Sequence, residues 1–320
     1  MKKRIHLSNI CVGMYIEELE DSSINGFDKR RLLITSQAEL RTILASNAMS
    51  AIIDTAKGKD VCEAADPSWE LIRARFEAEL ESSFHAGEIR QARECIESTR
   101  PMIRQMLSSA HRDGSFDFDG AHGIVEAVMS DALESAGALI AMTKLKDRDE
   151  GTFLHCLAVS ALMIAFGRSL GLGEETIRDL GLGGLVHDLG KATVPHAVLN
   201  KPGKLSPAEF ALVRQHPARG AALLRGACDL PQTVLDVCLY HHEKLDGTGY
   251  PFGLKEDAIP LAARIAAICD VYDAMVTIRP YKRGWSQAQT VEMMLNSHGH
   301  FDRDLLKRFV SQLVVKGSLQ

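Results

Sequence analysis

The sequence predicts a mainly α-helical protein, in which a small α/β N-terminal domain and a helical connector precede an all-α C-terminal domain. β-Favouring residues concentrate in residues 1–60, whereas residues 61–146 are charged and carry apolar residues at helical spacing. From 147 to 315, apolar segments alternate with helix caps, glycines and prolines, and no strand pattern interrupts them. We therefore expect domain boundaries near residues 60 and 146.

Composition argues against several classes of protein. The formal net charge is −5, so the chain lacks the basic excess of a nucleic-acid-binding protein. The longest apolar run, Leu154–Phe166, is shorter than the ~20 residues of a membrane span, and the start MKKRIHLSN has no signal-peptide pattern. The seven cysteines form no CxxC pair and are odd in number, which is typical of reduced thiols. We therefore expect a cytoplasmic protein.

Short elements are expected in residues 1–60. Arg4–Leu19 carries β-favouring residues on both sides of a break at Gly13, and Arg31–Thr35 and Ala51–Thr55 are short apolar runs of strand type. Between these two runs, Ser36–Asn47 has a helix pattern that opens on a good N-cap. We find no catalytic cluster in this region.

The connector is expected to be helical over most of its length. Glu70–Glu81 and Glu88–Met106 are amphipathic, and Ala121–Met142 is a further helix candidate. The stretch His111–Gly123 contains three glycines and three aspartates, a composition typical of a loop. The apolar faces of these helices favour packing on the last domain or pairing with a second subunit in a homodimer.

Caps and helix breakers define the helices expected in the C-terminal domain. Gly171 and Gly190 are stop signals, and Pro231 and Pro260 are start signals. The helices expected are, in order, Thr152–Leu170, Glu174–Leu189, a helix opened by the capping box Ser206–Glu209, Pro231–Glu243 and Leu261–Val276.

Two adjacent pairs in this domain suit metal ligands. His187-Asp188 ends an apolar helix, and adjacent helical residues point about 100° apart, so one can bind a metal terminally while the other bridges two metals. A carboxylate has two oxygens to share, which suits Asp188 for bridging. His241-His242 precedes the turn-rich segment Glu243–Pro251, the kind of loop that lines sites. Taken singly, each pair is more commonly a surface or capping pair than a metal site.

Three further residues have a structural alternative to metal binding. His155 lies on an apolar helix, where a histidine is more commonly a satisfied core residue. His216 precedes Pro217 inside a helix pattern, where proline removes a backbone donor and bends the helix. Asp270 lies mid-helix among apolar residues, so its carboxylate needs a partner. A metal is one such partner, and Arg264 is the alternative.

Together these candidates fit two metal ions. Mixed imidazole and carboxylate ligands suit iron, manganese, zinc or nickel, whereas a structural zinc site favours a cysteine motif. Two ions ~3.5–4 Å apart can hold a hydroxide between them and grip a phosphate. Lys191, Arg279 and Lys282 are placed to bind phosphate, although each alone is typical of a solvated surface charge. The candidate ligands are His155, His187, Asp188, His216, His241, His242 and Asp270.

The order of these motifs resembles the HD-GYP family over roughly residues 147–310. The segments that carry the resemblance are, in order, His187–Lys191, Lys201–Leu205, His216-Pro217, His241–Glu243, Asp246–Pro251, Asp270–Ala274, Arg279–Lys282 and His300–Asp302. Residues 3–60 are similar to the small N-terminal domain often found ahead of HD-GYP domains, through Val12–Tyr15 and Ile53–Thr55.

The resemblance implies an HD-type helical fold and a bacterial phosphodiesterase that linearises cyclic di-GMP to pGpG, sometimes continuing to GMP. It implies two divalent transition-metal ions, with iron expected first and manganese, nickel or zinc after it. One metal would be held by His155, His187, Asp188 and Asp270. The second would share Asp188 and be held by His216, His241 and His242.

The resemblance also assigns roles around the metals. Asp188 and Lys191 would be catalytic, and Lys191, Arg279 and Lys282 would hold the substrate phosphates. Tyr250 would shape the lip of the site or, within the GYP loop, contact a GGDEF-type diguanylate cyclase. A purely structural turn accounts for Tyr250 equally well.

Two residues depart from the family pattern. Some members carry a glutamate one turn before the first histidine and hold a third metal. Gly151 stands there, with Glu150 beside it, so we expect two metals and not three. Ile278 stands where a polar residue is common before the Arg-Pro-Tyr segment, which would weaken substrate positioning but not metal binding.

These departures leave a binding module as an alternative to an enzyme. Such a receptor would hold cyclic di-GMP or a partner protein and hydrolyse little. A third hypothesis is an HD phosphohydrolase that acts on another cyclic dinucleotide or nucleotide. The GYP loop and the Arg279–Lys282 segment argue against that third hypothesis.

Overall fold

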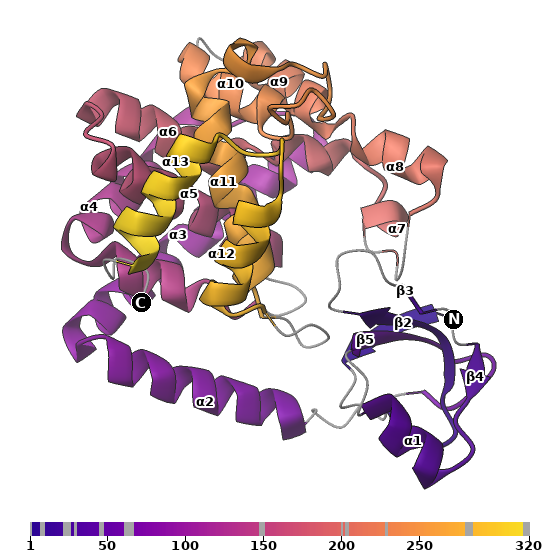
Figure 1. Ribbon diagram of the computed structural model, residues 1–320. Helices are drawn as coiled ribbons and strands as arrows, with labels where there is room; N and C mark the ends of the chain where they lie inside the picture. The colour runs from indigo at the N-terminus through magenta and orange to yellow at the C-terminus, as the bar shows by residue number, and fades with distance from the viewer. Residues whose placement is uncertain are drawn as a thin grey trace.

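The computed structural model consists of a helical body and a small β-sheet unit at the N-terminus (Figure 1). It describes residues 2–6, 10–21, 27–28, 31–44, 48–60, 67–146, 151–199, 201, 205–227, 230–278 and 284–315. Three residues singled out from the sequence, Glu150, Arg279 and Lys282, lie outside the described residues. The expected fold class, mainly α with a small α/β unit first, is confirmed.

The N-terminal unit is an antiparallel sheet that packs against one helix, α1 (Gln37–Leu44). A turn at Gly13, where φ is 100°, separates the first two strands, as the sequence predicts. Ile5, Ile16 and Ile53 of the sheet form a buried cluster with Ile43 of α1. The strands are β1 (Lys2–His6), β2 (Tyr15–Asp21), β3 (Phe27–Asp28), β4 (Leu32–Leu33) and β5 (Ala48–Asp54), and β5 lies between β1 and β2.

The connector forms three helices: α2 (Pro67–Ser83), α3 (Ala86–Arg112) and α4 (Phe118–Met142). The expected loop over His111–Gly123 is wrong in extent, because only residues 113–117 separate α3 from α4. Asp117 accepts a hydrogen bond from the Gly120 main-chain nitrogen at 3.0 Å. One of the aspartates that indicated a loop is therefore the N-cap of α4.

α3 and α4 belong to the core of the helical body. Ile103 of α3 and Val125 and Leu139 of α4 are fully buried in one cluster with apolar residues of α5 (Gly151–Ser169). The apolar faces of the connector therefore pack against the C-terminal helices, one of the two arrangements that the sequence suggests.

α5 is the central helix of the body, and α4, α6 (Glu174–Val186) and α11 (Leu261–Val276) pack against it. α10 (Gln232–Tyr240) packs against α6 and α11. α5 begins at Gly151, one residue before the expected start at Thr152. By length and mean hydropathy (1.4), Thr152–Ser169 resembles a membrane span, but 78% of it is buried inside the protein. The apolar composition of α5 is therefore accounted for by its place in the core.

Three short helices follow: α7 (His196–Leu199), α8 (Pro207–Val213) and α9 (His216–Ala227). The expected capping box opens α8, since Ser206 and Glu209 bond each other's main-chain nitrogens through their side chains. α8 and α9 are separate helices, so Pro217 lies in the first turn of α9, where a missing N–H costs little. The bend expected at Pro217 is instead a break between two helices.

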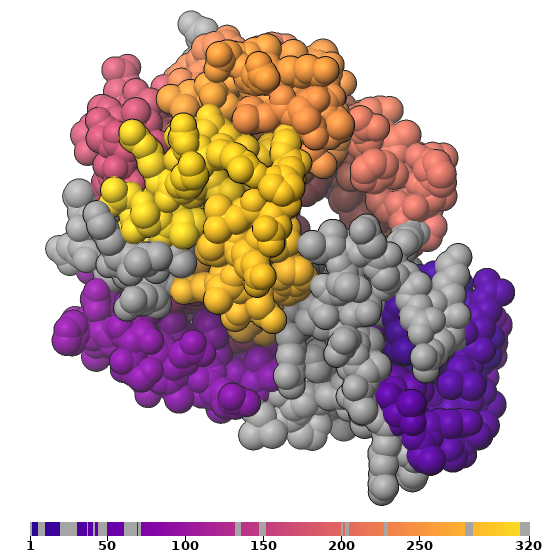
Figure 2. Space-filling model, viewed as in Figure 1, coloured from indigo at the N-terminus to yellow at the C-terminus, as the bar shows by residue number. Residues whose placement is uncertain are grey.

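Two further helices, α12 (Gln287–Asn296) and α13 (Arg303–Phe309), cover α11, and a π-helical segment, Val310–Val315, follows α13. The Phe309 ring lies 5.2 Å from the rings of both Phe166 on α5 and Tyr272 on α11. α13 therefore holds these two helices together. Figure 2 shows the segment around α7 and α8, in salmon, on the same side of the molecule as the N-terminal unit.

Candidate metal centre

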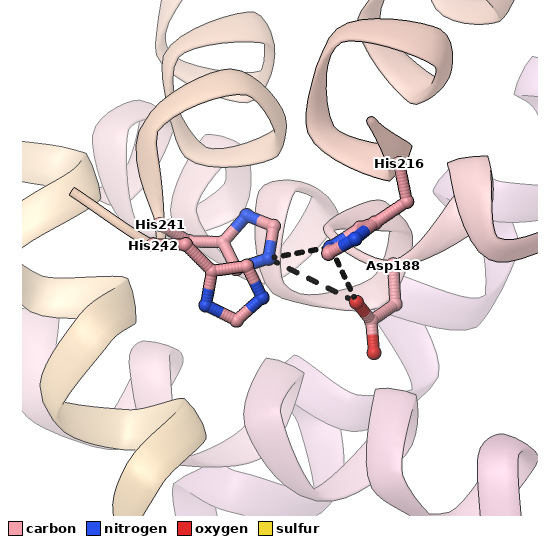
Figure 3. A group of neighbouring side chains, drawn as sticks. All are labelled: Asp188, His216, His241 and His242. Atoms are coloured by element: carbon pink, nitrogen blue, oxygen red, sulfur yellow. Dashed lines mark hydrogen bonds and ion pairs between the residues drawn. The ribbon is translucent and has the colours of Figure 1, made fainter. Parts of the chain in front are cut away.

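Asp188 lies where four histidine rings converge. It follows α6 and leads into a short 3₁₀ helix, η2 (Leu189–Thr193). Asp188 Oδ1 lies 3.2 Å from His216 Nε2 and 3.8 Å from His241 Nε2 (Figure 3). Asp188 Oδ2 lies 3.4 Å from His187 Nε2 and 3.6 Å from His155 Nε2. The two oxygens therefore face two different pairs of histidines, which is the arrangement that a bridging carboxylate needs.

Three of these histidines direct Nε2 at Asp188 because a main-chain carbonyl engages Nδ1. His187 Nδ1 and His216 Nδ1 each donate to the carbonyl three residues earlier at 2.7 Å. His241 Nδ1 lies 3.0 Å from the carbonyl four residues earlier. A carbonyl can only accept, so the proton must be on Nδ1 and the lone pair on Nε2. This is the tautomer that a metal ion requires.

The carboxylate of Asp270 faces the same histidines from α11. Its Oδ1 lies 3.2 Å from His155 Nε2 and 3.9 Å from His187 Nε2. Arg264, the alternative partner considered from the sequence, instead donates to Asp302 at 2.9 Å. The structural alternative for Asp270 is therefore wrong.

All seven candidate ligands are brought together in three overlapping groups. Within each group, the donor atoms lie within 4.8 Å of one another. The groups are Asp188 with His216, His241 and His242; His155 with His187 and Asp188; and His187 with His241 and Asp270. Two buried atoms of these groups, His187 Nε2 and Asp188 Oδ1, have no hydrogen-bond partner among the described residues. Unsatisfied buried donors and acceptors are rare, so this donor set fits a cation.

The electrostatics of the site prepare several ligands for binding. Burial, together with the neighbouring His242, holds the pKa of His241 well below its ordinary value, and burial lowers the pKa of His242 to about 3. Burial alone would raise the pKa of Asp188, but the Lys191 ammonium and His187 hold it well below its usual range. These imidazoles are therefore neutral and the carboxylate ionised, as metal ligands must be.

Lys191 is the basic residue that the structure places at the site. Its Nζ lies 2.5 Å from Asp188 Oδ2, and its side chain is 33% exposed. It therefore lies between the central carboxylate and solvent. Arg279 and Lys282, the other two predicted phosphate-binding residues, lie outside the described residues.

Ile278, which directly precedes that segment, is held through its main chain. Its N–H donates to Lys144 O at 2.8 Å, and its carbonyl accepts from the Lys146 N–H at 3.0 Å. Any residue type except proline can make these bonds. With isoleucine at position 278, the residue before the segment predicted to bind phosphate is therefore still anchored to the end of the connector.

Tyr250 of the GYP loop stands next to the histidines. Its ring lies 4.7 Å from that of His242 and 6.4 Å from that of His216. The guanidinium of Arg214, the residue that ends α8, lies 4.9 Å from the centre of the Tyr250 ring. Tyr250 is therefore at the edge of the site and is tied to the end of α8.

Comparisons with known proteins give the family of the chain. Residues 127–305 match the family model of the HD domain, and residues 2–121 match that of a domain of unknown function, DUF3391. A solved structure of an HDG"Y"P protein from Bdellovibrio bacteriovorus covers 99% of this chain and 100% of its own, with a TM-score of 0.59 and 19% identity, and so shares the fold. A cyclic di-GMP phosphodiesterase of Pseudomonas aeruginosa is 39% identical over 322 residues, which are 97% of this chain and 76% of that protein. The chain belongs to the HD-GYP family.

Relatives of this HD-GYP chain are not all named for one substrate. A 3'3'-cGAMP-specific phosphodiesterase of Vibrio cholerae is 36% identical over 201 residues, which are 61% of this chain and 43% of that protein. The family membership therefore does not by itself choose between cyclic dinucleotides.

The HD-GYP site also contains residues that sequence reasoning left without a role. Glu243 is 2% exposed, and its carboxylate accepts main-chain hydrogen bonds from Phe252, Gly253 and Leu254 at 2.7, 3.2 and 3.0 Å. It therefore fixes the GYP loop from inside. A glutamate directly after two histidine ligands was the only signal for this role.

Asp273 is the second such residue, and it contacts His155 from behind. His155 Nδ1 donates to Asp273 Oδ2 at 2.7 Å. Burial lowers the pKa of His155, but hydrogen bonds to Asp270 and Asp273 raise it to about 9. A proton and a metal therefore compete for His155 Nε2. The recurrence of aspartate three residues after Asp270, one turn along the same helix, was the available signal.

Proposed function

We propose that the chain is a metal-dependent phosphodiesterase that hydrolyses cyclic di-GMP to pGpG. The observation that carries this proposal is the position of Asp188, whose two oxygens face different pairs of histidines at 3.2 to 3.8 Å. Two bound divalent ions would supply an activated water and neutralise charge on the phosphate. The 39% identity with a cyclic di-GMP phosphodiesterase over 97% of the chain supports the choice of substrate.

We propose that the ligands form two sets that share Asp188. In the first set, His155 Nε2 and His187 Nε2 lie 3.6 and 3.4 Å from Asp188 Oδ2. Asp270 joins this set because its Oδ1 lies 3.2 Å from His155 Nε2. In the second set, His216 and His241 approach Oδ1, and His242 completes that group. With Gly151 at the first position of α5, no side chain is available there for a third metal, so we propose two ions, with iron first and manganese, nickel or zinc as alternatives.

The chain's own residues would bind and orient the substrate. Lys191 can turn from Asp188 to a phosphate oxygen, because its ammonium reaches both the carboxylate and solvent. Arg279 and Lys282 follow Ile278 in the sequence and would also hold the phosphates. Tyr250 would border the nucleotide at the lip of the site.

Lys282→Ala is expected to raise KM for cyclic di-GMP by about 10- to 100-fold, the loss of ~1.5–3 kcal/mol that accompanies a charged hydrogen bond. Metal content should remain at the wild-type value, because Lys282 is not a ligand. Steady-state kinetics together with elemental analysis check both quantities. A loss of metal in this variant would contradict the assignment.

The proposed activity can be tested directly on the full chain. Protein purified anaerobically and loaded with Fe(II) or Mn(II) should convert cyclic di-GMP to pGpG, with a slower step to GMP as a further outcome. A substrate panel that includes 3'3'-cGAMP decides between cyclic dinucleotides, as the Vibrio cholerae relative requires. No turnover with any metal, while calorimetry still detects binding, would instead identify a receptor.

The remaining expectations are proposals of the same kind. We propose the division 1–60, 61–146 and 147–315, with the connector helices packed on the last part. We place the protein in the cytoplasm, since Cys95, Cys156, Cys238 and Cys269 are free and buried. We also propose a homodimer and a GGDEF-type diguanylate cyclase that binds at the GYP loop. Phe252, which is 61% exposed and lies two residues after Tyr250, offers a contact for such a partner.

A further inference from the structure

Lys146 and Asp273 form a buried ion pair directly behind His155. The side chain of Lys146 is 0% exposed and that of Asp273 is 2% exposed. Lys146 Nζ donates to Asp273 Oδ2, the same oxygen that accepts from His155 Nδ1 at 2.7 Å. On the other side of the ring, Asp270 Oδ1 lies 3.2 Å from Nε2. Two carboxylates one turn apart on α11 therefore hold opposite edges of one imidazole.

His155 differs from the other ligating histidines in what engages its Nδ1. Main-chain carbonyls engage Nδ1 of His187, His216 and His241, which lie at helix ends. His155 lies inside α5, and its Nδ1 donates to the Asp273 carboxylate at 2.7 Å. Its acceptor is therefore a side chain, and a side chain can rotate away.

Lys146 removes that freedom from Asp273. A buried carboxylate without a cation is costly, and Asp273 lies near two further carboxylates, Asp270 and Asp188, that also contact His155. The Lys146 ammonium compensates the charge of Asp273 and fixes its rotamer. Thr277 Oγ1 donates to the Asp273 main-chain oxygen at 2.6 Å and also lies 3.4 Å from Asp273 Oδ2.

We propose that Lys146 is a positioning residue, which holds Asp273 in place as the acceptor for His155 Nδ1 and so directs His155 Nε2 at one of the two metal positions. This inference rests on the proposed function. Lys146 comes from the end of the connector, and its main-chain N–H bonds the Ile278 carbonyl at 3.0 Å. A residue outside the helices that carry the ligands thus sets the geometry of one metal and not the other.

The test is metal binding by Lys146→Met, with Mn(II) as the probe. Methionine keeps an unbranched stem but has no charge. We expect the affinity of one Mn(II) to fall by about 10- to 100-fold, the usual effect of removing support behind a ligand, while the second ion binds as in wild type. Calorimetric titration and the metal content after desalting read this out as a change from two ions to one.

Lys144→Met is the matched control, because Lys144 lies two residues earlier on the same segment and its charge also interacts with that of Asp273, but it makes no hydrogen bond or ion pair with Asp273 among the contacts described. It should retain two ions with wild-type affinity. A rescue separates positioning from simple stabilisation. In the double variant Lys146→Met, Asp273→Asn, the new amide oxygen can still accept from His155 Nδ1, and no charge is buried there. That double variant should recover the lost affinity to within about tenfold of wild type.

Three results would overturn the inference. The first is a folded Lys146→Met protein, judged by circular dichroism and metal-free Tm, that binds two ions with wild-type affinity. The second is a double variant that binds no better than a folded Lys146→Met protein. If Lys146→Met does not fold, two double variants are compared: Lys146→Met with Asp273→Asn, and Lys146→Met with Asp273→Leu. The third result that would overturn the inference is an equal metal content in these two double variants. Wild-type protein that binds fewer than two ions would contradict the proposed function instead.

Discussion

Asp188→Ala is expected to empty both metal positions and to abolish turnover of cyclic di-GMP. The carboxylate faces histidines of both sets, at 3.2 Å from His216 Nε2 and 3.4 Å from His187 Nε2, and directs a different oxygen at each set. Its removal also leaves the Lys191 ammonium, 2.5 Å away, to repel cations from the centre. Metal ions stabilise the transition state by several kcal/mol, so their loss should lower kcat/KM on the order of 1000-fold or more.

Elemental analysis of the anaerobically loaded variant, followed by product chromatography, measures both effects. Asp236→Ala on α10 is a suitable control, since the Asp236 carboxylate accepts from Gln232 at 2.7 Å and is outside all three ligand groups. It should keep two ions and wild-type turnover. An Asp188→Ala protein that kept two ions and full activity would show that Asp188 does not bridge.

Gly190→Ala is expected to destabilise the helical body by about 3 kcal/mol or more and to weaken metal binding. A Cβ at Gly190 would lie 1.9 Å from His216 O and 2.5 Å from the Gly220 main-chain nitrogen. Both are backbone atoms of α9, so the whole helix must shift to admit one methyl group. Overpacking typically costs ~1–3 kcal/mol and exceeds this where the obstacle is backbone. Because α9 begins at His216, the shift also moves a ligand.

Urea unfolding of metal-free protein gives the stability change, and calorimetry gives the change in metal affinity. Gly87→Ala is the matched control, because a Cβ there would meet nothing within 4 Å, in the first turn of α3. That variant should be neutral or more stable by up to ~1 kcal/mol. Equal stability of the two variants would mean that α9 accommodates the methyl group without movement.

Helix bounds were predicted well where the sequence carries a clear start or stop signal, such as a proline at the helix start. Leu261–Val276 lies between Pro260 and the extended Thr277, and the structure has the same bounds. The loop expected over His111–Gly123 failed because glycine and aspartate also serve at helix starts. Asp117 is a cap, and Gly120 lies in the first turn that it caps. Composition alone does not distinguish a loop from two helix ends that meet.

The donor atoms of the site could be predicted, but what orients them could not. Ligand types recur in recognisable pairs, such as His187-Asp188 and His241-His242. Three of the acceptors behind the histidines are main-chain carbonyls, which have no sequence signature. The fourth is Asp273 with Lys146, two residues 127 positions apart that only the packing of α11 against the connector brings together.

The two apolar clusters of the protein have a thermodynamic consequence. One consists of the sheet with α1 and the other of the helices from α3 onward, and in the described residues they share no member. We therefore expect each unit to melt in its own cooperative transition, and a ligand to raise the melting temperature only of the unit that binds it. In calorimetry, metal loading would thus shift the endotherm of the helical body to higher temperature. The endotherm of the sheet unit would stay in place and serve as an internal reference.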